Sequence, residues 1–428
     1  MCSVTHTKDK YANAIEVSMG SVENMHQKLN PYSFYSYMRK NNPLEYNDKI
    51  DIWNAYRYND IKKILTNFSA FSSDFTKFEP QDQEGLFRRT LLSYDPPFHR
   101  YLRNTISSTF NPSEIEKLEP RIKNIANDLI NKVIDKGSMD LVRDFSYPLP
   151  VTVIAELLGI PTEDRPLFKT WADELLKSID EAVAAGAPRR NDRIDAVRNE
   201  MEEYFRNAIA KKREKPEQDL ITQLLKAEAD GRKLSEEELL SFCGLLLQAG
   251  HLTTVNLINN CIWSLLENPA QLAKLNNSLS SSHPTSSALD LAIEETLRYR
   301  SPVQALVRFT TKDTELGGKT IRAGKRVVTW IGSANHDESI FTNPEEFDIL
   351  RSPNPHIAFG AGIHLCLGAP LARLEGHIAL NVLMSRLQSL EFDDDPTNLE
   401  PIAGSSFLFG VKNLQLKFEP VQSIRSPS

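Results

Sequence analysis

The sequence has few cysteines and no paired cysteine motif. Its four cysteines, Cys2, Cys243, Cys261 and Cys366, include no C-x-x-C pair, which argues against a zinc ribbon and against a thioredoxin-type redox motif. Four cysteines in 428 residues are also too few for a disulfide framework, so the count fits a protein of the reducing cytosol. Cys243 and Cys261 lie in apolar helical sequence and are expected to be buried small hydrophobic residues.

Long apolar runs and an excess of positive charge are absent as well. The start, MCSVTHTKDKYANAIEVSMG, has no apolar core after a basic stub and does not resemble a signal peptide. No run approaches the ~18 apolar residues that span a bilayer. The net charge of −7 argues against a nucleic-acid surface, because phosphate binding needs a basic face. We therefore expect a cytoplasmic monomer that binds neither nucleic acid nor a membrane.

The composition is that of a globular protein, with 40% hydrophobic and 25% charged residues. No internal repeat or interdomain linker is visible in the sequence. We expect a flexible N-terminal segment over residues 1–28, a single domain over 29–420 and a flexible tail over 421–428.

Hydrophobic periodicity predicts a mainly α fold with small β-sheets (α+β). Helical spacing dominates from Asp95 almost to residue 300, and the longest helix is expected over 235–267, with Ser235 and Glu238 as its capping box. The shorter elements are expected as a strand over 52–58, a helix over 59–66, a loop over 72–86, a surface loop over 276–287, strands over 303–310 and 318–328, and a last helix over 370–387.

One cysteine, Cys366, stands just before a helix in a glycine-containing loop. A helix N-terminus and free backbone N–H groups lower the pKa of a thiol and hydrogen-bond its sulfur, which favours a thiolate. Gly360, Gly362 and Gly368 would let the backbone approach a flat ligand closely. A plain buried cysteine at a helix start is the alternative. A dinucleotide loop does not fit, because Leu365 stands where G-x-G-x-x-G needs its third glycine.

The whole loop FGAGIHLCLG, residues 359–368, meets every fixed position of F-x-x-G-x-x-x-C-x-G. The sequence thereby resembles the cytochrome P-450 family over about residues 30–418, and DPPFHRYLR with PNPHIAFGAGIHLCLGAPLARLEG is most similar to soluble bacterial members. The resemblance implies the triangular-prism fold of that family and heme b (iron protoporphyrin IX) as cofactor. It also implies that Cys366 is the metal ligand, with Phe359 and Gly360 beside the cofactor.

Two further clusters gain a role from the resemblance. Glu295 and Arg298 share a helix face at spacing i, i+3, which alone predicts only an exposed ion pair. The family's E-x-x-R pair implies instead a buried structural network, completed by Arg351. The heme propionates would be held by His99, Arg103, Arg308 and His364, although each residue taken alone reads as surface charge.

The long helix carries AGHLT, residues 249–253. Gly250 weakens the helix, and the hydroxyl of Thr253 can bond a carbonyl one turn back and bend it, although a core helix with a tolerated glycine is equally consistent. The family pattern is A-G-x-[D/E]-T, so Ala249, Gly250 and Thr253 match and Leu252 replaces the acid. His251 points about 100° away from Leu252 around the helix. We expect protons to arrive by a water file or from the substrate itself.

By resemblance the protein is a monooxygenase that hydroxylates or epoxidises a hydrophobic steroid, terpenoid, fatty acid or polyketide with O₂. Its electrons would come from a ferredoxin or flavodoxin-type donor, and secondary metabolism is its expected setting. The alternatives are a peroxide-driven peroxygenase and a heme-based sensor. The expected substrate contacts are Leu245, Gln248, Ala249, Gln304, Leu306 and Phe407.

Overall fold

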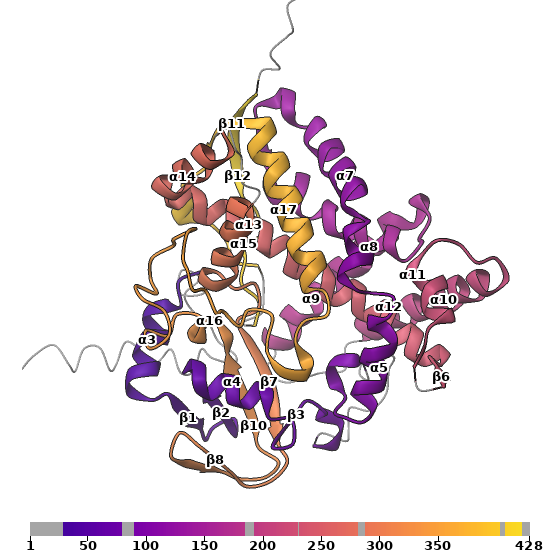
Figure 1. Ribbon diagram of the computed structural model, residues 1–428, viewed down its shortest axis with the longest axis vertical. Helices are drawn as coiled ribbons and strands as arrows, with labels where there is room; N and C mark the ends of the chain where they lie inside the picture. The colour runs from indigo at the N-terminus through magenta and orange to yellow at the C-terminus, as the bar shows by residue number, and fades with distance from the viewer. Residues whose placement is uncertain are drawn as a thin grey trace, which may run out of the picture.

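The computed structural model describes residues 29–78, 90–184, 192–229, 231–280, 287–402 and 407–421. Apart from Val421, the segments expected to be flexible lie outside these ranges. Helices fill most of the molecule, and the largest sheet lies at its lower left in Figure 1. The helices are α3 Tyr32–Asn41, α4 Tyr58–Thr66, α5 Phe98–Ser107, α6 Pro112–Glu116, α7 Glu119–Asn131, α8 Pro148–Leu157, α9 Arg165–Ala184, α10 Asp192–Glu214, α11 Leu220–Lys226, α12 Glu236–Gly250, α13 Leu252–Glu267, α14 Pro269–Leu279, α15 Ser287–Tyr299, α16 Ile331–Ala334 and α17 Ala369–Arg386.

The largest sheet joins strands that are far apart in the sequence, in the order β1-β2-β10-β7-β3. Its strands are β1 Leu44–Asn47, β2 Ile52–Ala55, β3 Phe71–Ser72, β7 Ala305–Thr310 and β10 Arg326–Trp330. β2 and β10 are parallel, with Ile52 opposite Arg326. The second sheet has the order β11-β12-β4, with β11 Leu387–Phe392, β12 Gln415–Pro420 and β4 Ser138–Asp140, and two hairpins pair β5 Glu228–Ala229 with β6 Arg232–Lys233 and β8 Thr314–Leu316 with β9 Lys319–Ile321. The expected mainly α fold with small sheets is confirmed.

Four expected elements differ from the structure. The strand expected over 52–58 ends at Ala55, and α4 begins at Tyr58. The strand expected over 318–328 is β9 and β10, separated by a turn in which Gly324 has φ +79°. The loop expected from residue 276 begins only after α14, because Leu279 packs against the core and extends the helix to that point. The helix expected over 235–267 is two helices, which meet at His251. Its capping box is present, with Glu238 N–H donating to Ser235 Oγ at 3.2 Å.

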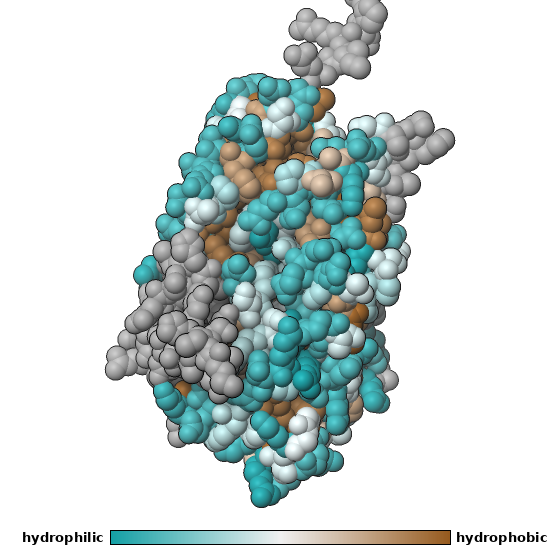
Figure 2. Space-filling view, turned by 90° about the vertical axis from the view of Figure 1, so that its left-hand side faces the viewer, coloured by the Kyte–Doolittle hydropathy of each residue, from teal (hydrophilic) through white to brown (hydrophobic). Residues whose placement is uncertain are grey.

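The core is centred on α13 and α17, whose inward faces are almost entirely buried. α17 packs beside α7 (Figure 1), and it also contacts α13 and α15. Together α12 and α13 are long and apolar enough to cross a membrane, but 67% of their most apolar window is buried inside the fold, as in a core helix. The face in Figure 2 is mostly hydrophilic, and its apolar residues gather mainly in the upper part.

Candidate active site

The loop before α17 is built to present one sulfur atom. Cys366 N–H donates to Phe359 O at 2.9 Å, which folds the loop back on itself. Gly360 and Gly362 have φ +75° and +73°, which side-chain-bearing residues rarely adopt. A Cβ atom on Gly362 would also lie 2.7 Å from Leu65 O. Both glycines are therefore required by backbone conformation, and Gly362 is required by the close approach of α4 as well.

Cys366 is an exposed residue, although its thiol lies among protein atoms. Burial raises the pKa of the Cys366 thiol, and the backbone N–H groups of Gly368 and Ala369 and the charges of Arg103 and Arg373 oppose that rise. The N–H groups belong to the start of α17, so this is the expected helix-terminus arrangement. A cation bound to the sulfur would complete the stabilisation of the thiolate.

Four basic side chains from separate parts of the chain gather around the accessible side of this loop. The rings of His99, on α5, and His364, in the loop, have centroids 4.3 Å apart. Arg103 Nη1 donates to Leu365 O at 2.8 Å, which ties α5 to the loop. Arg308, on β7, is within electrostatic range of His364 and lowers its pKa. The structure thus brings together the four residues expected to bind propionates.

Three of these side chains have little or no hydrogen bonding to the part of the chain that the structure describes. The Nε2 atoms of His99 and His364 are buried without a hydrogen-bond partner. Arg308 is buried and donates only to the carbonyl of its own neighbour, Val307, at 2.8 Å. Burial lowers the pKa of His99 to about 4, of His364 to about 3 and of Arg308 to about 10. Buried polar groups need hydrogen-bond partners and a buried guanidinium needs a counter-charge, so the cluster fits the two carboxylates of heme.

The break between α12 and α13 is stabilised by two threonines. His251, at the break, has φ −87° and ψ −74°. Thr253 Oγ1 donates to Ala249 O at 2.8 Å, and Thr254 Oγ1 donates to Gly250 O at 3.2 Å. These side-chain hydroxyls compete with backbone N–H groups for the carbonyl oxygens of the helix, which favours a bend. The bend expected from Gly250 and Thr253 is present, and Thr254, for which no role was expected, contributes to it.

The residues before and after the break are unusually accessible for the centre of a core helix. Gln248 and Ala249 are exposed, whereas Leu245 is buried one turn earlier. Leu252 and Thr253 are half-buried. His251 is buried, and its Nε2 atom lies 3.3 Å from Tyr147 O. Gln248, Ala249 and Thr253 therefore remain available to a ligand, whereas His251 faces the protein.

Glu295 is the centre of a buried network that supports the segment before Cys366. Arg298 donates to Glu295 Oε1 and Oε2 at 2.8 and 2.9 Å, and Arg351 Nε donates to Glu295 Oε1 at 3.1 Å. Arg298 also donates to the carbonyl oxygens of Asn335, Pro344 and Glu346, at 3.0, 2.8 and 2.8 Å. The network fixes the backbone over about 335–351, so these three residues lie together in the arrangement expected.

One expected substrate contact was wrong. Gln304 is buried, and its side-chain amide accepts a hydrogen bond from Tyr35 Oη at 2.9 Å and donates to Ser301 O at 2.7 Å. A Cβ atom on Gly332 would lie 2.0 Å from Gln304 Oε1, so the amide is enclosed by the fold. Leu306 is half-buried and lies 3.7 Å from the position of a Gly360 Cβ atom, which places it beside the cysteine loop.

Phe407 is half-buried and stacks on Trp330, with ring centroids 6.4 Å apart.

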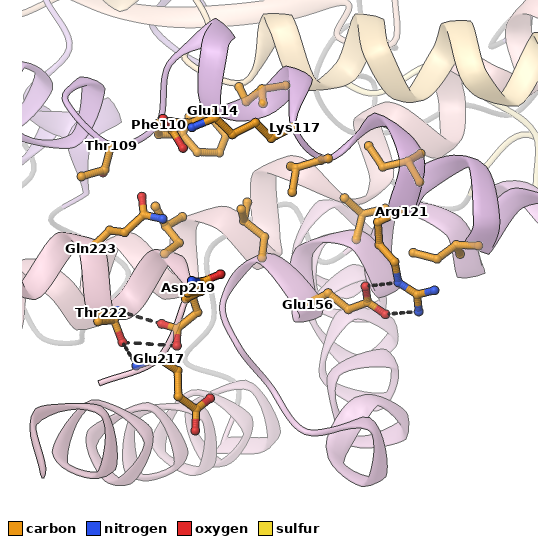
Figure 3. A pocket seen from close by; sticks show the side chains of 18 of the residues that line it. Thr109, Phe110, Glu114, Lys117, Arg121, Glu156, Glu217, Asp219, Thr222 and Gln223 are labelled. Carbon is orange, nitrogen blue, oxygen red and sulfur yellow. Dashed lines mark hydrogen bonds and ion pairs between the residues drawn. The ribbon is translucent and has the colours of Figure 1, made fainter. Parts of the chain in front are cut away.

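A hollow of about 610 Å³ lies away from these residues, between α6, α7, α8 and α11 (Figure 3). Its charged residues are engaged within the protein: Arg121 forms two hydrogen bonds of 2.7 Å with Glu156, and Lys117 pairs with Glu114 at 2.7 Å. None of the expected site residues lines this hollow.

Comparison with known proteins identifies the family. Residues 18–418 match the family model described as Cytochrome P450. The chain is 40% identical over 404 residues to "Putative cytochrome P450 YjiB" of Bacillus subtilis, covering 94% of this chain and 98% of the relative. It is 38% identical over 383 residues to "Cyclomarin C epoxidase CymV" of Salinispora arenicola, covering 89% and 94% of the two chains.

A solved structure agrees with these relatives. The crystal structure of CYP109E1 from Bacillus megaterium in complex with testosterone superposes with a TM-score of 0.80 at 38% identity, covering 91% of this chain and 99% of that one. Proteins of this family bind heme b and act as oxidoreductases that use O₂, a small-molecule substrate and redox partner proteins. The chain described here belongs to the cytochrome P450 family and is a heme-dependent monooxygenase.

Proposed function

We propose that the protein hydroxylates or epoxidises a hydrophobic small molecule of the steroid, terpenoid, fatty acid or polyketide class, with two electrons from a ferredoxin or flavodoxin-type donor. The observation that carries this proposal is the convergence of His99, His364 and Arg308 on the loop that presents Cys366: the Nε2 atoms of both histidines have no partner among the described residues, and Arg308 donates to the neighbouring Val307 carbonyl. We further propose a cytoplasmic monomer that acts in secondary metabolism without binding nucleic acid or a membrane.

The protein's own residues would bind and orient the cofactor. Cys366 would bind its iron, with the sulfur held by the N–H groups of Gly368 and Ala369. His99, Arg103, Arg308 and His364 would bind its propionates, and Phe359 and Gly360 would lie beside it. When bound, heme with a thiolate ligand supplies O₂ activation and insertion of one oxygen atom into a C–H or C=C bond. The remaining tasks of the chain are to position the substrate, exclude water and move protons.

The break between α12 and α13, which together we call the distal helix, supplies the polar atoms for those tasks. Thr253 donates its hydroxyl proton to Ala249 O, so its oxygen retains lone pairs that can accept a hydrogen bond from water. Leu252 carries no proton. Protons would therefore reach Thr253 through ordered water or a hydroxyl group of the substrate.

The substrate would lie against the accessible residues of this break. Ala249, Leu306 and Phe407 offer apolar surface there, and Gln248 offers one exposed amide, whereas Leu245 is buried. An apolar surface with a single polar handle suits the hydrophobic classes named above. The names of two relatives are consistent with these classes: one is named as an epoxidase of cyclomarin C, and the crystal structure of CYP109E1 contains testosterone.

A peroxide-driven reaction is the second candidate, and Leu252 favours it, because peroxide already carries the protons that the missing acid would have delivered. Supplying hydrogen peroxide to the purified heme protein, in place of the electron donor and O₂, discriminates the two. Turnover with peroxide that equals or exceeds turnover with a ferredoxin system would make the protein a peroxygenase. A heme-based sensor would show ligand binding without turnover in either system.

The cysteine assignment is tested by Cys366→Ser. The parent's reduced carbon monoxide complex should have the absorption of thiolate ligation, and the variant should lose both that absorption and turnover. Cys261→Ala is the matched control, since Cys261 is buried in α13 and should leave the spectrum intact. A Cys366→Ser protein that keeps the parent spectrum would contradict the proposal. Screening hydrophobic compounds for a substrate-induced spin-state change then identifies the substrate class.

A further inference from the structure

A short π-helical turn, Val142–Ser146, is followed by a tyrosine that contacts His251 at the break between α12 and α13. Tyr147 follows the turn directly, and its carbonyl oxygen lies 3.3 Å from His251 Nε2. Ser146 Oγ donates to Asn259 Oδ1 at 2.7 Å, two turns into α13. π-Helical turns occur frequently at functional sites. This one is anchored to the distal helix at two points.

The aromatic ring of Tyr147 is held against the break itself. The rings of Tyr147 and His251 are perpendicular, with an interplanar angle of 87° and centroids 4.2 Å apart. His251 is buried, and its Nδ1 atom lacks a hydrogen-bond partner among the described residues. The hydrogen bond between His251 Nε2 and the Tyr147 carbonyl is therefore the polar contact that holds this ring. A change in the position of Tyr147 would move His251 and, with it, the bend in the chain.

The other edge of the Tyr147 ring is held by α9. The Tyr147 hydroxyl donates to Asp173 Oδ1 in a short hydrogen bond, and the ammonium group of Lys169 lies 5.4 Å from the ring centroid. Lys169 and Asp173 are four residues apart and thus on one face of α9. One tyrosine is consequently held by two charged residues of α9 and by the histidine at the break.

We propose that Tyr147 is a positioning residue that couples the break in the distal helix to α9. The hydroxyl bond to Asp173 fixes the ring, the ring and the Tyr147 carbonyl fix His251, and His251 sets the bend from which Thr253 reaches Ala249. A displacement of α9 would move Tyr147 and His251 and would thereby shift Thr253, whose hydroxyl oxygen can accept a hydrogen bond from water. The catalytic relevance of the bend rests on the proposed function, whereas the mechanical coupling does not.

Tyr147→Phe tests the coupling, because it removes only the bond to α9. In the heme-loaded protein, hydrogen exchange of the peptide over about 249–255 should become about fivefold faster, the factor expected from one lost hydrogen bond. Asp173→Ala should give the same increase, and the double variant should add little to it. Carbon monoxide rebinding after photolysis reports on the distal space and should change in both single variants.

Tyr204→Phe is the matched control. Tyr204 donates to Asp164 Oδ2 at 2.6 Å and packs on Phe168 of α9, but this tyrosine is on α10. It should alter neither the exchange of the 249–255 peptide nor carbon monoxide rebinding. Parent-like exchange in Tyr147→Phe, unchanged rebinding, or equal effects from Tyr204→Phe would each overturn the proposal. Because these readouts need no substrate, their failure is distinct from failure of the proposed reaction, which the Cys366→Ser spectrum tests.

Discussion

Arg298 and Glu295 face each other inside the protein: Arg298 Nη2 lies 2.8 Å from Glu295 Oε1, and the two side chains are 0% and 1% exposed. Arg351 and the N–H group of Asp348 also donate to this carboxylate, at 3.1 and 3.0 Å. The charge of Glu295 is thereby matched by donors from two segments of the chain. The same contacts join α15 to the backbone that precedes the cysteine loop.

Glu295→Ala should yield misfolded or heme-free protein. Removing one partner of a buried ion pair costs about 3–5 kcal/mol, because the remaining charge is left uncompensated. Soluble yield and heme content after purification measure the effect. The control is Asp290→Ala on the same helix, where an aspartate that is 59% exposed pairs with His377 at the surface. That change should cost less than about 1 kcal/mol. A folded, heme-loaded Glu295→Ala protein would remove the structural role.

Arg308→Ala should weaken heme retention without abolishing it. A hydrogen bond to a charged group contributes about 1.5–3 kcal/mol, and three other donors would remain. Heme transfer to an excess of apomyoglobin should be roughly tenfold or more faster than in the parent, as such a free energy implies. Arg322→Ala serves as control, because Arg322 pairs with Asp313 in an exposed turn. Equal transfer rates in all three proteins would show that Arg308 does not hold the cofactor.

Leu252→Glu should raise the amount of product formed per NAD(P)H consumed and lower the release of peroxide. The physical reason is that a carboxylate beside Thr253 can carry protons, whereas leucine cannot. Leu252→Gln, which has a similar size and no acid, separates proton transfer from polarity and should not improve coupling. Unchanged coupling in Leu252→Glu, with little peroxide from the parent, would show that proton delivery does not depend on this position.

Glu375→Gln should remove a pH dependence of stability. Glu375 is buried in α17, and its carboxylate oxygens have no partner among the described residues, so burial raises the pKa of Glu375 from 4.5 to about 8. The folded state keeps the proton that the unfolded state releases, and stability should therefore fall as pH rises from about 4.5 to 8. The loss is at most about 4–5 kcal/mol, at about 1.4 kcal/mol per pKa unit.

Melting temperatures of the parent and of Glu375→Gln over this pH range check the prediction. The two curves should diverge as pH increases, with the glutamine variant more stable at pH 8. Glu391→Gln is the control at an exposed position of β11, where the side chain is 64% exposed, and should follow the parent. Parallel curves for the parent and Glu375→Gln would show that the Glu375 carboxylate has a hydrogen-bond or ion-pair partner in the folded protein.

The sequence predicted those features of the structure whose determinants all lie within one short segment. The FGAGIHLCLG loop, the start of α17 and the capping box of Ser235 were all predictable, since helix signals and glycine requirements act over a few residues. Gln304 was assigned wrongly because its neighbours Tyr35 and Gly332 are remote in the sequence. Tyr147 was not identified for the same reason: its partners His251 and Asp173 lie on other helices.

The parallel pairing of β2 with β10 has a consequence for synthesis on the ribosome. Ile52 faces Arg326, so β2 emerges long before its partner strand has been translated. At about 5–20 residues per second, the wait is on the order of 14–55 seconds. During that interval β2 can pair with β1 but not with β10, and joining β2 to β10 requires closing a long loop of chain. The N-terminal segment therefore completes its sheet only after most of the helical core has been made.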